Sequence, residues 1–273
     1  MNEESWVVTG PQIIEVDDVR AVRAALVAGR VDIVGQDEPG ARIEVHRVQG
    51  RPLEVSLADG ELRVGYGYTL GGWESFIDRF RNFHASDGVD VHIAVHRDVA
   101  VKLGTVTAEG LVADVVRGGT VSTVSGAVVV DGTHGMLVAN AVSGDLAVRN
   151  HTGDLKANAV SGSVTASGAF AQISVTTVSG AITLDVARAA GIGVQTVSGD
   201  TTVRLPADLG TSVSARSVSG RVVVDGEARA GDGPLSGSVD VVTGDGACRL
   251  RVKSVSGHLT VLRRAVATSG PVV

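Results

Sequence analysis

The sequence has few aromatic residues, prolines and cysteines, and each shortage narrows the range of structures it can form. Aromatic residues make up 3% of the 273 residues, prolines number 6, and Cys248 is the single cysteine. One cysteine excludes an intrachain disulfide, and a small buried apolar side chain is its expected role. The sequence also lacks an apolar run of 18 residues, the length that a membrane-spanning helix needs.

Basic clusters are lacking as well. The net charge is −6, and residues of both signs alternate along the chain without a basic run. Nucleic-acid binding is therefore disfavoured, because it needs a concentrated positive patch. The N-terminus, MNEESWVVTG, is acidic and has no apolar core of a signal peptide, so we expect a cytoplasmic location and little membrane contact.

Glycine, by contrast, is abundant, with 36 residues, and much of it belongs to a repeat. A four-residue phrase, Val-Ser-Gly preceded by a variable residue (Leu-Ser-Gly in one copy), recurs at steps of 18, 18, 18, 19, 21, 17 and 20 residues. Its eight copies begin at Thr123, Ala141, Ala159, Thr177, Thr196, Ser217, Pro234 and Ser254. Thr105-Val-Thr-Ala is a degenerate earlier copy. A repeat of this length indicates a solenoid.

Two aliphatic positions that alternate with polar residues follow each phrase, which predicts a strand with one buried face. The first position holds Val128, Leu146, Val164, Ile182, Thr201, Val222, Val239 and Leu259, and the second Val130, Val148, Ala166, Leu184, Val203, Val224, Val241 and Val261. The same alternation predicts that Val124 and its equivalents are buried. The glycine indicates a bend or a close backbone approach.

We therefore predict an all-β, parallel β-solenoid with coils of about 18–20 residues. Two strands or three short strands in each coil both fit the sequence. We assign residues 101–262 to this array, residues 1–100 to an N-terminal β-strand region, and 263–273 to a tail or cap of one continuous body. Alternating apolar residues predict N-terminal strands at 13–16, 31–34, 43–48, 53–57, 62–64 and 89–96. Residues 17–28 fit a helix or a strand, and we favour the strand.

Residues 66–84 interrupt this pattern with six of the eight aromatic residues in the sequence. Positions 73, 76, 77 and 80 have the spacing of one face of a short amphipathic helix. This helix would cap the strand stack or dock a partner. The candidate partner contacts are Tyr66, Tyr68, Trp73, Phe76, Phe80 and Phe83.

No arrangement of residues in the sequence indicates catalysis, a metal or a cofactor, so we expect a protein that is not an enzyme. The repeated serines have no repeated histidine beside them, and we expect them to bond their own backbone or their neighbours in the stack. His134 and His151 could face one another, although exposed turn histidines are the commoner outcome. Along the outer face we expect Asp131 beside Arg149, and Asp185 with Arg204 and Asp225 as neighbours of opposite charge. The repeated serines are Ser125, Ser143, Ser161, Ser179, Ser198, Ser219, Ser236 and Ser256.

The repeated T-V-S-G and S-G-D phrases, with the earlier strands, resemble a bacterial family of β-strand-repeat proteins of unknown function labelled "putative adhesin". The resemblance covers about residues 13–262 and implies a parallel β-solenoid in a cell-envelope or stress-related role. Our leading hypothesis is an interaction scaffold that binds a protein partner or associates with itself through the solenoid ends. The alternative is a carbohydrate-binding or carbohydrate-active β-helix.

Overall fold

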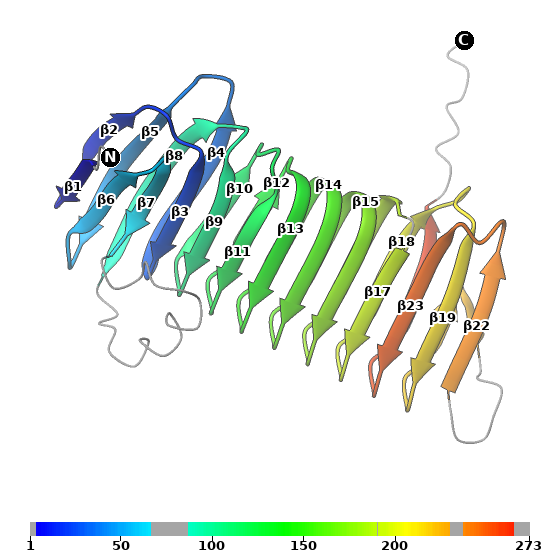
Figure 1. Ribbon diagram of the computed structural model, residues 1–273. Coiled ribbons are helices and arrows are strands. Elements are labelled where there is room, and N and C mark those ends of the chain that lie inside the picture. The colour runs from blue at the N-terminus through cyan, green and yellow to red at the C-terminus, as the bar shows by residue number, and fades with distance from the viewer. Residues whose placement is uncertain (1–3, 67–86, 190, 230–236, 265–273) are drawn as a thin grey trace, which may run out of the picture. The chain divides into compact units, whose positions relative to one another are not determined.

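The structure, a computed structural model, describes residues 4–66, 87–189, 191–229 and 237–264 (Figure 1). All regular secondary structure within these residues is β-strand, most of it in parallel pairs, which confirms the predicted all-β solenoid. The chain forms two compact units, Met1–His151 and Thr152–Val273. Each unit is described by itself below. The predicted helix at 66–84 lies, apart from Tyr66, outside the described residues.

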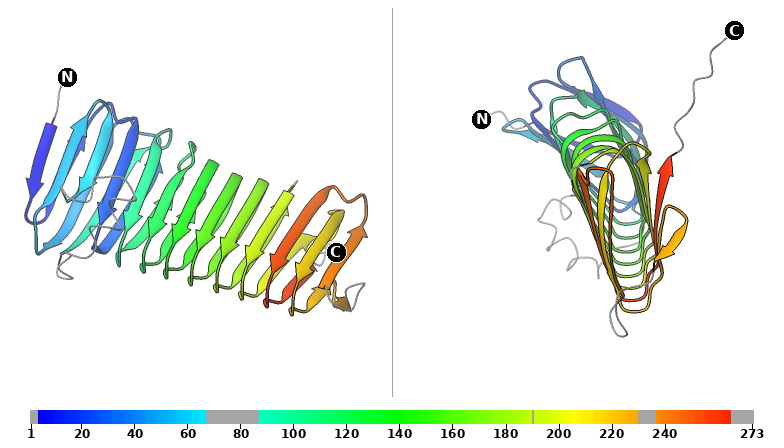
Figure 2. Two further views of the ribbon diagram at one scale, coloured as in Figure 1. Left: turned by 60° about the horizontal axis from the view of Figure 1, so that its bottom comes forward. Right: turned by 90° about the vertical axis from the view of Figure 1, so that its right-hand side faces the viewer.

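Unit 1 stacks its strands in two rows that face each other across a core of aliphatic side chains (Figure 2). Row 1A runs β1-β6-β7-β3-β9-β11-β13, and row 1B runs β2-β5-β8-β4-β10-β12-β14. Row 1A consists of β1 (Glu4–Val8), β6 (Leu53–Ala58), β7 (Glu61–Gly65), β3 (Ala21–Leu26), β9 (Ala100–Thr105), β11 (Gly119–Thr123) and β13 (His134–Ala141). Row 1B consists of β2 (Gln12–Val16), β5 (Ala41–Gln49), β8 (Gly88–His96), β4 (Ala28–Gln36), β10 (Glu109–Ala113), β12 (Val128–Asp131) and the start of β14 (Leu146–Ala159).

The strands of unit 1 do not stack in the order of the sequence. The coil formed by β3 and β4 lies between the coil of β7 and β8 and the coil of β9 and β10, and all these pairings are parallel. Beyond β7 and β8 the pairing becomes antiparallel, through β6 to β1 and through β5 to β2. All the predicted N-terminal strands are confirmed, and residues 21–26 form a strand, so the helical alternative for this segment was wrong.

Unit 2 has the same two-row construction. Row 2A runs from the second half of β15 through β17, β23 and β19 to β22, and row 2B from the first half of β15 through β16, β18, β24 and β20 to β21. Row 2A consists of β15 (Val164–Thr177), β17 (Gly191–Thr196), β23 (Cys248–Ser254), β19 (Thr211–Ser217) and β22 (Gly237–Thr243). Row 2B adds β16 (Ile182–Arg188), β18 (Thr201–Pro206), β24 (Leu259–Arg264), β20 (Val222–Val224) and β21 (Glu227–Arg229).

The last coil of the chain is inserted between two earlier ones. β23 pairs in parallel with β17 on one side and with β19 on the other, and β24 lies in the same way between β18 and β20 (Figure 1). The eighth copy of the phrase therefore stacks between the fifth and the sixth. The outermost strands β22 and β21 pair antiparallel with β19 and β20.

The aliphatic layers predicted from the repeat form the core. Both aliphatic positions that follow each phrase are buried in all copies except at Val241, which is half-buried on the outermost strand β22. Residues in neighbouring coils are in register, so that Val128 pairs with Leu146, and Ile182 pairs with Thr201. Burial of aliphatic side chains at about 25 cal/mol per Å² is the main stabilising contribution to such a stack.

The glycines of six phrases lie where the backbones of neighbouring coils touch. A Cβ atom on Gly199 would overlap the carbonyl oxygen of Gly180, and one on Gly257 would overlap that of Gly199. Gly220 has the same relation to Gly257, and Gly144 in unit 1 to Gly126. The prediction of a close backbone approach is confirmed, and the contacts repeat the stacking order with Gly257 between Gly199 and Gly220.

In four copies the hydroxyl residue that opens the phrase satisfies the backbone inside the corner. The hydroxyl oxygens of Thr177 and Thr196 accept hydrogen bonds from the N–H groups of Gly180 and Gly199, at 3.1 and 3.0 Å. Those of Ser217 and Ser254 accept from the glycines three residues later, both at 2.8 Å. Because Thr177 and Thr196 are buried, these hydroxyls supply a partner to N–H groups that would otherwise lose their water.

The valines of the phrase are not buried, so that prediction was wrong. In unit 2 they form an exposed row with exposed fractions of 45 to 79%. The corner interrupts the alternation, so the valine continues the preceding strand and points outward while the residue before it points inward. This valine row consists, in stacking order, of Val160, Val178, Val197, Val255 and Val218.

The insertion of the last coil also changes the neighbours predicted for the charged residues on the outer face. Asp131 pairs with Arg149, and Asp185 pairs with Arg204, as expected. Asp225 is not a neighbour of Arg204, because β24 lies between them and places Leu262 beside Arg204. Arg263 and Arg264 of β24 instead approach Asp225 and Asp185, at 3.4 and 2.5 Å.

The backbone contact at the corners can be tested with one pair of alanine substitutions. We expect Gly199→Ala to lower the free energy of unfolding by about 1–3 kcal/mol, because the new methyl group must push two coils apart. Gly193→Ala is the control, since a Cβ there meets no atom closer than 3.7 Å. Removing a strand glycine at such a site stabilises by about 0.5–1 kcal/mol. Urea unfolding measures the free energy of unfolding of both variants. Equal values for Gly199→Ala and Gly193→Ala would contradict the proposed backbone contact.

Candidate functional sites

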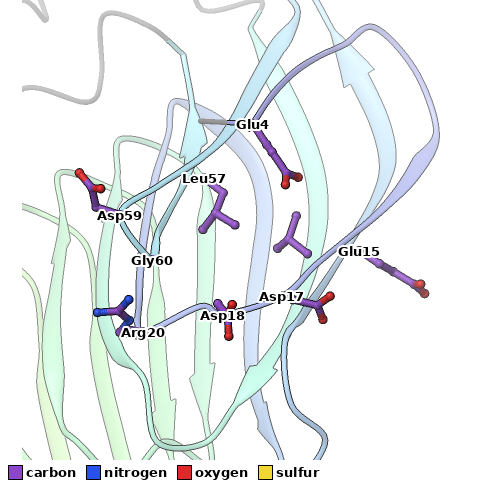
Figure 3. A pocket seen from close by; sticks show the side chains of 9 residues that line it. Glu4, Glu15, Asp17, Asp18, Arg20, Leu57, Asp59 and Gly60 are labelled. Carbon is purple, nitrogen blue, oxygen red and sulfur yellow. The ribbon is translucent and has the colours of Figure 1, made fainter. Parts of the chain in front are cut away.

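An acidic hollow of about 360 Å³ lies in unit 1, where the turn after β2 meets the turn between β6 and β7 (Figure 3). Five acidic side chains and one arginine surround it, while Leu57 and Val16 supply apolar surface. Figure 3 shows Glu15 pointing away from the other side chains. The lining residues are Glu4, Glu15, Val16, Asp17, Asp18, Arg20, Leu57, Asp59 and Gly60.

Turn geometry brings these acids together. Asp18 and Asp59 have left-handed backbones with φ of 56° and 51°, a conformation that aspartate tolerates better than most residues. The N–H of Arg20 donates to the carbonyl of Gly60 at 2.8 Å, which joins the two turns. Within the described residues no group of three or more His, Cys, Asp or Glu side chains could hold a metal ion. The hollow is thus an acidic surface depression suited to a positively charged group.

A second hollow, of about 240 Å³, lies on the outer surface of row 2A in unit 2. It is lined by Ser214 and Arg216 of β19 and by Arg251, Val252 and Lys253 of β23. This site could not be predicted from the sequence, because β19 and β23 are distant in the chain and become neighbours only through the insertion of the last coil. The alternation of basic and apolar residues from Cys248 to Lys253 was its visible signal.

The serines of the phrase act in the stack, as predicted. The hydroxyls of Ser125, Ser179 and Ser198 donate to carbonyl oxygens of the neighbouring coil at 3.2, 3.4 and 3.4 Å. Ser219 and Ser256 make the same bond at 3.3 and 3.4 Å. These hydroxyls therefore extend the backbone ladder around the corner and have no base beside them in these contacts.

Two other residues that the sequence singled out are buried. His151 is fully buried, and its Nδ1 lies 2.8 Å from the hydroxyl of Thr133, so the prediction of an exposed turn histidine was wrong for it. His134 is exposed. Cys248 is buried as predicted, and this burial raises the pKa of its thiol, which the positive charge of Arg263 partly offsets. A thiol in this environment is a poor nucleophile.

Of the six aromatic candidates for partner contact, the structure describes one. Tyr66 is 2% exposed, so its ring packs in the interior and does not belong to the described surface. The other five candidates, Tyr68, Trp73, Phe76, Phe80 and Phe83, lie outside the described residues.

Comparison with known proteins bears out the family resemblance for part of the chain. Residues 166–262 match the family Toastrack DUF4097. This range contains the repeats of unit 2 from Thr177 onward, including the inserted last coil. A comparison with curated proteins gave no match. In the described parts of the chain, no helix combines the length and the apolar character needed to span a bilayer.

Solved structures of low identity match the chain, and one with a TM-score above 0.5 shares the fold. A structure described as a "putative lipid binding protein" from Parabacteroides distasonis is 13% identical, with a TM-score of 0.52, covering 94% of this chain and 97% of that one. A "putative adhesin" from Bacteroides fragilis is 11% identical, with a TM-score of 0.42 and coverage of 96% and 97%. A "putative cell adhesion protein" from Clostridium sporogenes is 12% identical, with a TM-score of 0.24 and coverage of 96% and 100%.

Proposed function

We propose that this protein is a non-enzymatic β-solenoid scaffold, adhesin-like in that it binds a macromolecular partner through its outer surface. The observation that carries the proposal is that the repeated hydroxyl groups form hydrogen bonds within the stack. The hydroxyls of Ser125, Ser179 and Ser198 bond to the neighbouring coil, and those of Thr177 and Thr196 bond inside the corner. The repeated hydroxyl groups thus build the stack, while the outward-facing residues, apart from the valine row, change from coil to coil.

The described surface offers features that suit binding more than chemistry. They are the acidic hollow of unit 1, the basic hollow and the valine row of unit 2. Apolar and charged surface patches of this kind commonly mark interaction sites. The family resemblance supports the adhesin-like part of the proposal and an envelope- or stress-related role, and the cytoplasmic location stays a prediction.

The aromatic segment is our proposed docking element for a protein partner. It interrupts coils of about 18–20 residues with a sequence whose apolar positions have helical spacing. Aromatic side chains are enriched at protein interfaces, where they combine large apolar area with few rotatable bonds. Tyr66 is excluded from this element by its burial.

The docking element can be tested without shortening the chain. We expect that replacing Tyr68, Trp73, Phe76, Phe80 and Phe83 by serine lowers partner recovery at least about tenfold, because anchor residues carry most of an interface's energy. The measurement is quantitative mass spectrometry after pull-down from native lysate, with unchanged circular dichroism as the control for folding. Equal recovery by the variant and the wild type would remove the docking role.

Self-association through the ends is a second way in which the scaffold could act. The outermost strands β1 and β22 carry exposed valines, Val7 and Val242, each 67% exposed. Outermost strands present unpaired backbone groups to a second chain.

Sedimentation velocity over a hundredfold range of protein concentration tests this association. We expect the average mass to rise with concentration and Val7→Lys or Val242→Lys to return the protein to monomer, because a charge on an edge strand opposes pairing. A wild-type protein that is monomeric at all concentrations would exclude it.

A further inference from the structure

The outer surface of β23 carries three cations in line. Arg249, Arg251 and Lys253 are exposed, whereas Cys248, Leu250 and Val252 between them are buried. Alternate residues of a strand lie about 6.8 Å apart on one face. Arg216 of β19 pairs in register with Lys253 and adds a fourth cation. We call these four residues, Arg249, Arg251, Lys253 and Arg216, the basic face.

The basic face has no acidic partner among the described residues: none of its four side chains takes part in an ion pair or side-chain hydrogen bond there. Its neighbours on β19, Ser212 and Ser214, are uncharged hydroxyl side chains in register with Arg249 and Arg251. Asp240 of β22 is in register with Ser214, so β19 separates it from β23. Most surface arginines of unit 1, such as Arg42, are by contrast held by carboxylates.

A low position in the surface, the trough at Gly193, lies beside the cations. On the other side of β23, β17 places Gly191 and Gly193 opposite Arg249 and Arg251 (Figure 1). An added Cβ on Gly193 would contact only the carbonyl oxygen of Ile173, at 3.7 Å, and no side-chain atom within 4 Å, while Gln172 covers Gly191. The surface is therefore low at Gly193, beside the charged side chains of β23.

The neighbouring side chains decide which polyanion fits. Phe170 is the single aromatic residue after Phe83 in the sequence, and it is buried, so bases of a single-stranded nucleic acid would have no ring to stack on. Guanidinium groups pair in a planar, bidentate manner with carboxylates and with phosphates, so the hydrogen-bonding side chains beside them must distinguish the two. The hydroxyls of Ser212 and Ser214 and the amide of Gln195 can exchange hydrogen bonds with ring hydroxyls, which a polyphosphate lacks.

We infer that the basic face and the trough at Gly193 bind an acidic polysaccharide, with its carboxylates on Arg249, Arg251 and Lys253 and its hydroxyl groups toward Ser212, Ser214 and Gln195. This inference deepens the proposed scaffold function and rests on it, because it gives the non-enzymatic surface a ligand class.

The test measures binding of fluorescein-labelled polygalacturonate, an unbranched polyuronate, to the full chain by fluorescence anisotropy. We expect saturable binding that weakens with salt, and no binding of neutral dextran. Arg251→Gln with Lys253→Gln should raise Kd about tenfold or more, since two charge-assisted contacts are lost. Gly193→Gln should also raise Kd several-fold, because it fills the trough without changing any charge.

The matched control is Lys102→Gln with Arg188→Gln, which removes the same charge from exposed positions on β9 and β16. We expect its Kd to stay within about twofold of the wild type. A wild type that does not bind polygalacturonate, an equal loss in the control, or equal or tighter binding of polyphosphate or oligothymidylate would overturn the assignment. The polymer length is followed in parallel: cleavage would overturn the non-enzymatic function while leaving the surface assignment intact.

Discussion

The structure depends on direct contact between backbones at the corners of successive coils. Gly180, Gly199, Gly257 and Gly220 each leave no room for a side chain against the carbonyl of a neighbouring glycine. This contact holds the flanking strands close enough for parallel hydrogen bonding and for aliphatic layers to pack on one another. The buried hydroxyls of residues such as Thr196 then satisfy the backbone inside the turn.

A corner of this kind fixes which groups touch but not which copy stacks on which. The last coil can therefore lie between two earlier coils, and in unit 1 the coil of β3 and β4 lies between two later ones. Antiparallel strands then end each stack. The insertion brings Arg251 and Lys253 beside Gly193 and Arg216. Both arginine and lysine are distant from those two residues in the sequence, so the proposed binding surface depends on the insertion.

The repeat allowed the strands, the core positions and the close approach at the glycines to be predicted, because each rests on local alternation within one copy. Stacking order could not be predicted, since Ser254-Val-Ser-Gly carries the same contacts as any other copy. The burial of Val124 equivalents was mispredicted because alternation does not continue through a corner. The acidic hollow and the basic face join residues from separate turns and strands, and only the alternation around Arg251 was visible in the sequence.

The most direct test of this account is a set of cysteine pairs on the valine row in a Cys248→Ala background. The N–H of Val255 donates to the carbonyl of Val197 at 3.2 Å, and that of Ser219 to Val255 at 3.0 Å. The account predicts rapid disulfide formation for the pairs 197–255 and 255–218, and none for 197–218, whose Cα atoms lie two coils, roughly 9.6 Å, apart. Efficient oxidation of the 197–218 pair, with the other two unreactive, would show that the coils stack in sequence order and would contradict it.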